Sequence, residues 1–382
     1  MGKETLQKKS SKFSYPRTPL KMNVFVLTIH NPEISLGPTA RLNGFLKSKE
    51  FQHHVNATLP PFTHNKKHTK FDTFVLLLKI ENYIIKNRKK IDLIHVVTPP
   101  SYSGIFAIMA KKIFKIPYIV DIGDPCAENI ASIKRLPVNS LTFRMLKKID
   151  TALYKNAEHL VLTSDGLKKY IPENSPNTTI LTGVMEEIHK KDPKISKKCL
   201  YLGQYGALQN FEYILEVFSK AIKEDDEISL DIYGQGNTQE CKELISKKGI
   251  SNLEHRINFL DPVPSEQIPE IAKNYSLGIV SLKLDSTLDY AIPTKALSYL
   301  SLGLPVFGTG GKSLEKLITE SNTGTISSSY NTEKDSKTLI EVLNSQETLK
   351  LQSVNAVKFA ENQLTYAQAG HALLEIYNFS LH

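Results

Sequence analysis

Residues suited to binding an anion gather in one segment of the second half of the chain, Ala291–Gly311 (AIPTKALSYLSLGLPVFGTGG). This segment predicts a helix that starts near a proline and ends at Gly303, followed by a short strand and a glycine-rich loop. Backbone N–H groups at a helix start and in such a loop bind phosphate oxygens, and a lysine there adds a full positive charge. An ordinary strand–helix–strand unit with a surface lysine is the alternative. We expect a phosphate site made by Lys295, Gly308, Gly310 and Gly311.

Carboxylates follow a predicted strand in the first half of the chain. The segment Asp121–Glu128 (DIGDPCAE) leaves the carboxyl end of a strand predicted at Pro117–Ile122. A carboxylate at such an edge could orient or deprotonate a substrate hydroxyl, which makes Asp124 a candidate catalytic residue, with loop capping as the alternative. His95 lies on another predicted strand, and we interpret it as a core histidine rather than a catalytic one.

Metal and disulfide patterns are absent from the sequence. The cysteines Cys126, Cys199 and Cys241 are widely spaced, which is typical of buried thiols in a reducing compartment. No Asp-x-Asp pair is present, and the acidic run Glu224–Glu227 is typical of a solvated helix end. We therefore expect no metal and no other cofactor.

The elements that must position these residues alternate along the first half. Its apolar runs are continuous and β-branched, as in parallel strands covered on both faces. The predicted strands are Met22–Ile29, Leu93–Thr98, Pro117–Ile122, His159–Thr163 and Thr178–Thr182, and the predicted helices are Pro38–Lys47, Phe71–Lys86, Ser103–Phe114, Leu141–Tyr154 and Gly166–Tyr170.

The alternation pauses in a polar stretch that contains a proline, and then it resumes. Strands are predicted at Cys199–Leu202, Ser229–Tyr233, Arg256–Leu260, Leu277–Leu282, Pro305–Phe307 and Gly324–Ser327. Helices are predicted at Phe211–Lys223, Gln239–Lys247, Ser265–Lys273, Thr294–Leu302, Leu314–Glu320 and Asp335–Leu343, with helical spacing again over Glu347–Tyr377.

Two such series predict two α/β domains of the Rossmann-like kind, facing each other across a cleft. Because open α/β sheets bind ligands beyond the carboxyl ends of their strands, we expect the functional site in that cleft. The expected division is a basic flexible leader at 1–20, an N-terminal domain at 21–185, a linker at 186–198, a C-terminal domain at 199–362, and a C-terminal helix at 363–382 that packs back toward the N-terminal domain.

Charge is distributed unequally along the chain. The net charge is +9, with +15 on residues 1–195 and −6 on residues 196–382. Such asymmetry is typical of a basic half that meets a polyanion, although lysine-rich solvated faces would give the same balance. The chain carries no nucleic-acid recognition motif, which favours an anionic membrane surface. The basic residues that we expect there are Lys86, Arg88, Lys89, Lys90, Lys111, Lys112 and Lys115.

Four segments of the second half resemble the family-4 glycosyltransferases, which are retaining enzymes of the GT-B fold. The resemblance extends over nearly the whole chain from about residue 22 and is strongest after residue 198. It implies a nucleotide-sugar donor, a glycan or polyprenyl-linked acceptor and a place in the synthesis of bacterial surface polysaccharides. The segments are Tyr201–Gly206 (YLGQYG), Leu230–Gly236 (LDIYGQG), Leu277–Leu282 (LGIVSL) and Pro293–Val306 (PTKALSYLSLGLPV).

The resemblance also implies roles for single residues. A glycine-rich turn that contains Gln204 would lie against the donor phosphates, and the turn that follows the next strand would border the nucleotide base. Lys295 would be the cation for the leaving diphosphate, and Asp124 would serve the acceptor. A loop before the first helix would face the diphosphate, with helix capping as the alternative there. The remaining donor-binding residues implied are Gly37, Arg41, Gly203, Gly206, Gly234 and Gly236.

One departure from the family pattern concerns two glutamates eight positions apart. The family places the first near the sugar and the second on the ribose hydroxyls, whereas this chain has Tyr290 and Ser298. A serine can make a single hydrogen bond but no bidentate charged contact. Ser298 would therefore hold the ribose less tightly, and Asp289 could substitute for the first carboxylate.

These observations predict a glycosyltransferase, hexosyltransferase-like, retaining and independent of metal. We expect it in the cytoplasm, at the inner face of the membrane. A non-catalytic GT-B subunit, which would bind a glycan or support another glycosyltransferase, is the alternative that Tyr290 and Ser298 favour. A nucleotide-sugar epimerase would need acids and bases in the cleft, and the missing carboxylates argue against it.

Overall fold

The computed structural model describes residues 21–31, 38–61, 70–184, 188, 196–206, 209–239, 241, 243, 255–283, 288–327 and 330–382. Gly37, the expected leader at 1–20, most of the expected linker at 186–198 and most of the helix predicted at Gln239–Lys247 lie outside these ranges.

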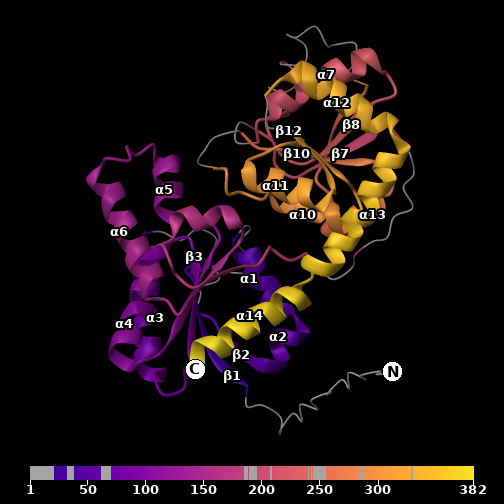
Figure 1. The fold of residues 1–382 in the computed structure, drawn as a ribbon. Coiled ribbons are helices and arrows are strands. Elements are labelled where there is room, and N and C mark those ends of the chain that lie inside the picture. Colours follow the sequence, from indigo (N-terminus) through magenta and orange to yellow (C-terminus); the bar gives the residue numbers. More distant parts are fainter. Residues whose placement is uncertain are drawn as a thin grey trace, which may run out of the picture.

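Two parallel six-stranded sheets form the frame of the described chain (Figure 1). Their orders are β2-β1-β3-β4-β5-β6 and β12-β11-β10-β7-β8-β9. The second order is that of a doubly wound nucleotide-binding domain, with its switch point between β7 and β10. The strands of the first sheet are β1 (Met22–Leu27), β2 (Val55–Thr58), β3 (Leu93–Thr98), β4 (Tyr118–Ile122), β5 (His159–Leu162) and β6 (Asn177–Thr179). Those of the second are β7 (Lys198–Leu202), β8 (Ser229–Tyr233), β9 (Ile257–Leu260), β10 (Leu277–Ser281), β11 (Val306–Thr309) and β12 (Gly324–Ser327).

Helices cover both faces of the first sheet, as its continuous apolar strands require. Helices α3, α4 and α6 pack on one face, where they bury Ile80, Ala107 and Leu153 against the strands. Helices α1, α2 and α14 pack on the other, with the fully buried Phe45 and Tyr377 among the residues there. The helices of this domain are α1 (Pro38–Lys47), α2 (Lys49–His54), α3 (Lys70–Asn87), α4 (Ile105–Phe114), α5 (Cys126–Lys134) and α6 (Leu141–Asn156), with the short 3₁₀ helices η1 (Ser101–Gly104) and η2 (Asp165–Tyr170).

The second sheet is covered in the same way. Helices α7 and α12 pack on one face around Phe218 and Leu339, and helices α10, α11 and α13 pack on the other around Leu300 and Ala356. The helices of this domain are α7 (Phe211–Glu224), α9 (Ile268–Ala272), α10 (Thr294–Ser301), α11 (Lys312–Ser321), α12 (Thr332–Asn344) and α13 (Gln346–Gln363), with a 3₁₀ turn η4 at Ser265–Gln267.

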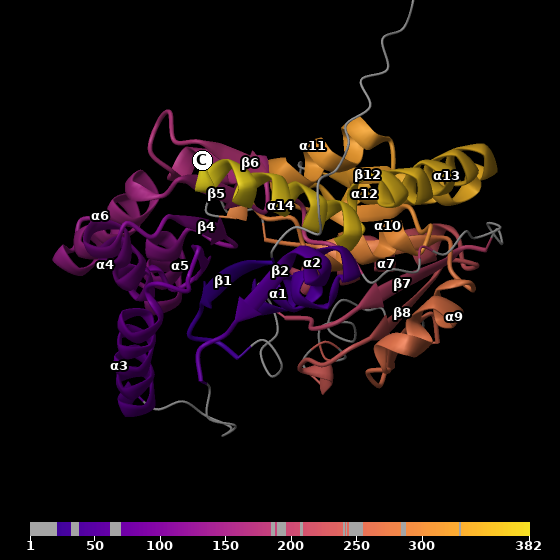
Figure 2. The same ribbon diagram turned by 90° about the horizontal axis from the view of Figure 1, so that it is seen from below.

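The last helix, α14 (Tyr366–Leu381), returns to the first domain, as expected (Figures 1 and 2). The chain therefore passes twice between the domains, and the two passages touch: Val184 N–H donates to the Leu364 carbonyl at 2.7 Å, and Val184 pairs with Thr365. Thr365 and Gln368 form a capping box that starts α14 as a new helix. The helical spacing over Glu347–Tyr377 thus belongs to two helices.

Two regions differ from the sequence-based expectation. Residues 49–58 form helix α2 and strand β2, which the polar sequence KEFQHHVNAT does not reveal because only Phe51 and Val55 are buried there. The acidic segment that begins at Asp121 passes through a short loop that holds Asp124 and then continues into helix α5.

Candidate functional site

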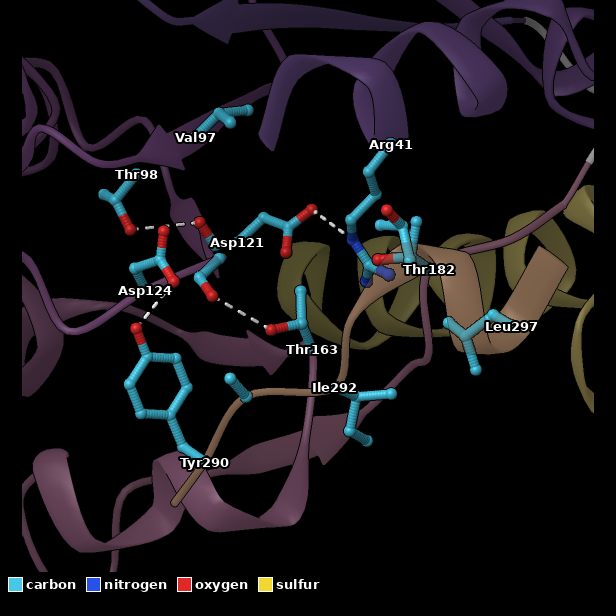
Figure 3. A pocket seen from close by; sticks show the side chains of 13 residues that line it. Arg41, Val97, Thr98, Asp121, Asp124, Thr163, Thr182, Tyr290, Ile292 and Leu297 are labelled. Carbon is cyan, nitrogen blue, oxygen red and sulfur yellow. Dashed lines mark hydrogen bonds and ion pairs between the residues drawn. The ribbon is translucent and has the colours of Figure 1, made fainter. Parts of the chain in front are cut away.

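A cavity of about 170 Å³ lies between the two domains, at the carboxyl ends of the first sheet's strands (Figure 3). The N-terminal domain contributes residues that follow β3, β4 and β5, and the C-terminal domain contributes the segment that leads into α10. This is the edge at which parallel α/β sheets bind ligands. The lining residues used below are Arg41, Thr98, Asp121, Asp124, Thr163, Tyr290, Thr294 and Leu297.

Arg41 and Asp121 form a buried ion pair on the N-terminal wall of the cavity. Arg41 Nε donates to Asp121 Oδ2 at 3.0 Å, and both side chains are almost fully buried. Arg41 Nη1 donates to the carbonyls of Ile180 and Leu181 at 2.7 and 2.8 Å. Two of the three guanidinium nitrogens, Nε and Nη1, are therefore hydrogen-bonded within the protein, and Nη2 has no partner among the described residues.

His95 and the returning helix complete this network. His95 Nε2 lies 3.9 Å from Asp121 Oδ2, and its Nδ1 is 2.7 Å from the hydroxyl of Tyr377 on α14. Burial lowers the pKa of His95 to about 4; the Asp121 charge opposes this and the Arg41 charge adds to it. The imidazole is neutral near pH 7, so it has the structural role that we expected for it. We call Arg41, Asp121, His95 and Tyr377 the Arg41–Asp121 network.

Asp124 faces the cavity beside a residue from the other domain. Tyr290 crosses from the C-terminal domain, and its hydroxyl donates to Asp124 Oδ1 at 2.8 Å (Figure 3). Its backbone carbonyl accepts from the Ser164 hydroxyl, and its ring packs edge-on against Tyr170. Burial raises the pKa of Asp124, and the hydrogen bond from Tyr290 lowers it in part. Asp124 is thus a shielded carboxylate with one of its oxygens already engaged.

Lys295 lies at the start of α10, and its charged end is buried. Its Nζ is shielded from solvent, has no hydrogen-bond partner among the described residues, and lies 3.7 Å from the centre of the Tyr201 ring. Burial lowers the pKa of Lys295 from 10.5 to about 7. A buried amine without a counterion is costly, and an anion placed against it would remove that cost.

Two glycine turns meet beside Lys295. Gly203 has a φ of +94°, and a Cβ on it would lie 4.0 Å from Lys295 Nζ. The carboxyl ends of β7 and β8 approach so closely that a Cβ on Gly234 would lie 1.9 Å from the Gly203 carbonyl oxygen. A Cβ on Gly236 would meet the Tyr205 ring at 2.3 Å, so only glycine fits at either turn. A Cβ on Gly206 would have an ordinary contact with Gln209 Oε1 at 3.8 Å, and the side chain of Gln204 is exposed.

The glycines after α10 lie elsewhere than expected. Gly308 is inside β11, paired with Val280 of β10, and a Cβ there would lie 1.7 Å from the Val280 carbonyl oxygen. Gly310 and Gly311 are buried, and a Cβ on Gly311 would lie 2.6 Å from the Asp289 Cα. The first turn of α11 is also occupied, since Ser313 N–H donates to the Asp289 carbonyl at 2.9 Å. These glycines admit a strand neighbour and the segment before Tyr290. Open amides at Gly310 and Gly311 stay a prediction.

Ser298 lies one turn after Lys295 on α10, and its hydroxyl donates to the Thr294 carbonyl at 3.1 Å. The hydroxyl of Ser298 therefore has its hydrogen-bond partner within the helix, and the chain has no charged side chain at this position, where the family resemblance implies a glutamate. Across the described residues, no three His, Cys, Asp or Glu side chains come together as a metal site requires.

Sequence reasoning passed over three contributors to the site: Asp121, Tyr201 and the reach of Tyr290 into the other domain. The signal for Asp121 was a carboxylate within a buried strand, which requires a cation partner. Tyr201 offered no such signal, because aromatic residues in strands are usually core residues.

Comparison with known proteins identifies the fold. Residues 184–359 match the family model described as Glycosyl transferases group 1, which covers most of the second domain. A search of curated protein sequences gives no match. Sucrose-phosphate synthase from Thermosynechococcus elongatus has a similar structure, with 12% identity, a TM-score of 0.69, and coverage of 94% of this chain and 98% of that one.

Two further solved structures are similar to this chain over nearly its whole length. HepE of Anabaena in complex with UDP and glucose has 12% identity and a TM-score of 0.65, over 94% of this chain and all of that one. A glycosyltransferase from Rickettsia africae ESF-5 has 14% identity and a TM-score of 0.66, over 94% and 99%. The chain has the GT-B fold, and residues 184–359 within it match the Glycosyl transferases group 1 model.

Proposed function

We propose that the protein is a glycosyltransferase that moves a sugar from a nucleotide-sugar donor to a hydroxyl of a glycan or polyprenyl-linked acceptor, in the synthesis of a surface polysaccharide. The observation that carries the proposal is the buried amine of Lys295, which has no hydrogen-bond partner among the described residues. It lies beside the Gly203 turn, and the neighbouring Thr294 lines the interdomain cavity. The group 1 match over residues 184–359 and the UDP-glucose bound by HepE of Anabaena support a nucleotide-sugar donor.

Lys295 would act on the leaving group. In the transfer, the bond between the sugar and the diphosphate breaks, and the diphosphate leaves with the electron pair. An ammonium held in a site shielded from water stabilises that developing charge more than it would in solution. The positive end of α10 and the backbone of the Gly203 turn lie at the same place. These groups supply the stabilisation without a metal ion.

Asp124 would act on the acceptor. The new bond forms between the sugar carbon and the acceptor oxygen, whose proton must go to a base. Asp124 Oδ2 carries no hydrogen bond to another residue's side chain, whereas Oδ1 is held by Tyr290. Since burial raises the pKa of Asp124, this carboxylate is a stronger base than an exposed one. Retention of configuration is part of the proposal on the family resemblance alone.

The acceptor is proposed to reach the enzyme at the inner face of the cytoplasmic membrane. The +15 charge of residues 1–195 supports contact with anionic lipid. No helix among the described parts of the chain is long and apolar enough to span a bilayer.

A donor screen tests the proposal. Thermal shift with the uridine, guanosine, adenosine and thymidine diphosphates would select the base, and hydrolysis of the corresponding nucleotide sugars would then be followed by diphosphate release. We expect one nucleotide to raise the melting temperature and its sugar derivatives to be hydrolysed slowly, since water replaces the acceptor. Lys295→Met is the control that should abolish release.

A non-catalytic subunit is the second candidate, and the Tyr290–Asp124 contact favours it because it fills part of the cleft from within the protein. Nucleotide binding without any hydrolysis, together with glycan binding, would select this candidate. Absence of nucleotide binding altogether would reject the enzyme and leave a subunit that binds a glycan or supports another glycosyltransferase.

A further inference from the structure

Large apolar side chains are exposed on one side of the N-terminal domain. Of the sixteen such side chains among the described residues, eleven fall between residues 71 and 145, about a fifth of the chain. Patches of this kind on soluble proteins usually mark an interaction surface. Three helices each expose a pair within their first two turns, and we call these six residues the apolar ridge: Phe71 and Phe74 on α3, Ile105 and Met109 on α4, and Leu141 and Met145 on α6.

The three helices form one surface. They cover the same face of the sheet, α4 packs between α3 and α6, and all three lie on the side away from the C-terminal domain (Figures 1 and 2). Each is followed by a parallel strand, β3, β4 or β5. A helix in such a unit runs antiparallel to its strand, so its first turns lie toward the strands' carboxyl edge. The ridge therefore lies toward the same edge as the cavity that holds Asp124.

The exposed charges of the three helices that carry the ridge have a single sign. On α3, α4 and α6 every charged side chain described as exposed is basic, while Asp72 and Glu81 are half-buried and Asp150 is buried. Lysine is depleted in protein–protein interfaces but is frequent beside apolar residues on surfaces that lie in the membrane interface. The exposed basic residues are Lys79, Lys86, Lys112, Arg144, Lys148 and Lys155.

We infer that the apolar ridge inserts into the headgroup region of an anionic lipid bilayer, with Arg144 and Lys148, which flank Met145 on α6, on the lipid phosphates. This deepens the proposed function, on which it rests for its purpose, because insertion adds an apolar contact to the electrostatic one. It also fixes the orientation: α3, α4 and α6 face the bilayer, and the cleft opens close to it. An acceptor anchored in the lipid would then meet Asp124 without leaving the surface.

A single introduced tryptophan tests insertion, because the chain has none of its own. Ile105→Trp places the reporter on the ridge, and Val354→Trp places it on an exposed position of α13 in the other domain. With vesicles of phosphatidylcholine and phosphatidylglycerol in equal parts, we expect the emission of Ile105→Trp to shift to shorter wavelength. We expect no shift for Val354→Trp, and none for either variant with pure phosphatidylcholine.

Substituting residues of the apolar ridge measures how much the ridge contributes to vesicle binding. The triple variant Phe71→Ser, Ile105→Ser, Leu141→Ser should lower partitioning into the anionic vesicles by roughly a hundredfold, since each lost apolar side chain reduces it several-fold. All three positions are more than half exposed, so folding should be unaffected. The matched control Leu351→Ser, Val354→Ser changes two exposed residues of α13 and should partition like the wild type.

Three outcomes would overturn the inference. The first is an unshifted emission of Ile105→Trp with anionic vesicles, and the second is wild-type partitioning of the triple variant. The third is a vesicle-free dimer that the triple variant converts to a monomer, which would make the ridge a contact between two copies. Donor hydrolysis without vesicles keeps the two proposals apart, because the triple variant should hydrolyse donor like the wild type whatever its partitioning.

Discussion

The two walls of the cleft hold their charges in opposite ways. On the N-terminal wall, Arg41 has Asp121 as its counterion and two backbone carbonyls as further partners. On the C-terminal wall, Lys295 has an aromatic face and no counterion. A buried charge that has its counterion is costly to unpair, whereas one left unpaired is available to a ligand. We therefore expect a structural role for the first wall and ligand binding at the second.

The largest effect is expected on stability, at the N-terminal wall, where Arg41 is paired with Asp121. Asp121→Asn keeps the shape of the side chain but leaves Arg41 buried without its counterion, which should lower the free energy of unfolding by about 3–5 kcal/mol. Urea unfolding followed by circular dichroism would measure it. The control Glu270→Ala breaks an exposed pair with Lys273 and should change stability by less than about 1 kcal/mol. If both variants behaved alike, the Arg41–Asp121 network would not hold the domain.

The next largest effect is expected on turnover, at Lys295 of the C-terminal wall. Lys295→Met retains the packing on Tyr201 and removes the charge, and we expect kcat/KM to fall by about 10²–10³-fold, as when one oxyanion-stabilising group is lost. Binding of the free nucleoside should weaken much less. Lys316→Met, an exposed lysine on α11, is the control. Equal losses in turnover and in nucleoside binding would make Lys295 a simple ground-state contact.

The same variant should also remove a pH dependence of stability. The folded-state pKa of Lys295 is about 7 and the unfolded value is 10.5, so the unfolded chain binds more protons between these limits. The free energy of unfolding of the wild type therefore rises with pH across this window, and the penalty is fully present below pH 7. Lys295→Met should show a smaller rise and equal or greater stability at neutral pH. A rise as steep as that of the wild type would contradict the burial of this amine.

A smaller effect is expected where the walls touch. Tyr290→Phe keeps the ring and removes the hydroxyl that donates to Asp124. Because this hydrogen bond lowers the pKa of Asp124 against the effect of burial, its loss should move the acidic limb of the kcat/KM profile to higher pH. Asp124→Asn should abolish that limb and most of the activity. A profile unchanged in Tyr290→Phe would separate Asp124 from acceptor activation.

The smallest effect is expected at Ser298. Ser298→Glu introduces the carboxylate that the family resemblance leads us to expect on α10, and it should tighten nucleotide-sugar binding by about fivefold through one charged hydrogen bond. Ser298→Gln is the control of equal size. Calorimetry that found weaker binding for the glutamate variant would show a pocket arranged around serine.

The sequence predicts the frame of the molecule better than its site. Continuous β-branched runs reveal buried parallel strands, and α1 occupies the expected residues Pro38–Lys47. Lys295 also lies in the first turn of α10, where the sequence predicts a helix start. The ion pair between Arg41 and Asp121 joins residues eighty positions apart, and Tyr290 reaches into the other domain. Such contacts depend on how sheets and domains pack, and local patterns carry no information about them.

Gly308 shows the same limit in another form. Its sequence context suggests an open loop, yet the close approach of β10 is what requires a glycine there. A glycine marks a place where a backbone comes near, and the sequence does not tell whether that backbone or a ligand's phosphate is the neighbour.

Proton uptake on ligand binding tests most directly whether Lys295 waits for the donor's diphosphate. Near pH 8 an amine with a pKa of about 7 is mostly neutral, and a bound diphosphate would raise that pKa and charge it. Titration calorimetry with the nucleoside diphosphate selected by thermal shift, in Tris and in HEPES, should show uptake of close to one proton by the wild type and none by Lys295→Met. Equal heats in both buffers for the wild type, or the same uptake by Lys295→Met, would contradict the assignment of Lys295 to the leaving group.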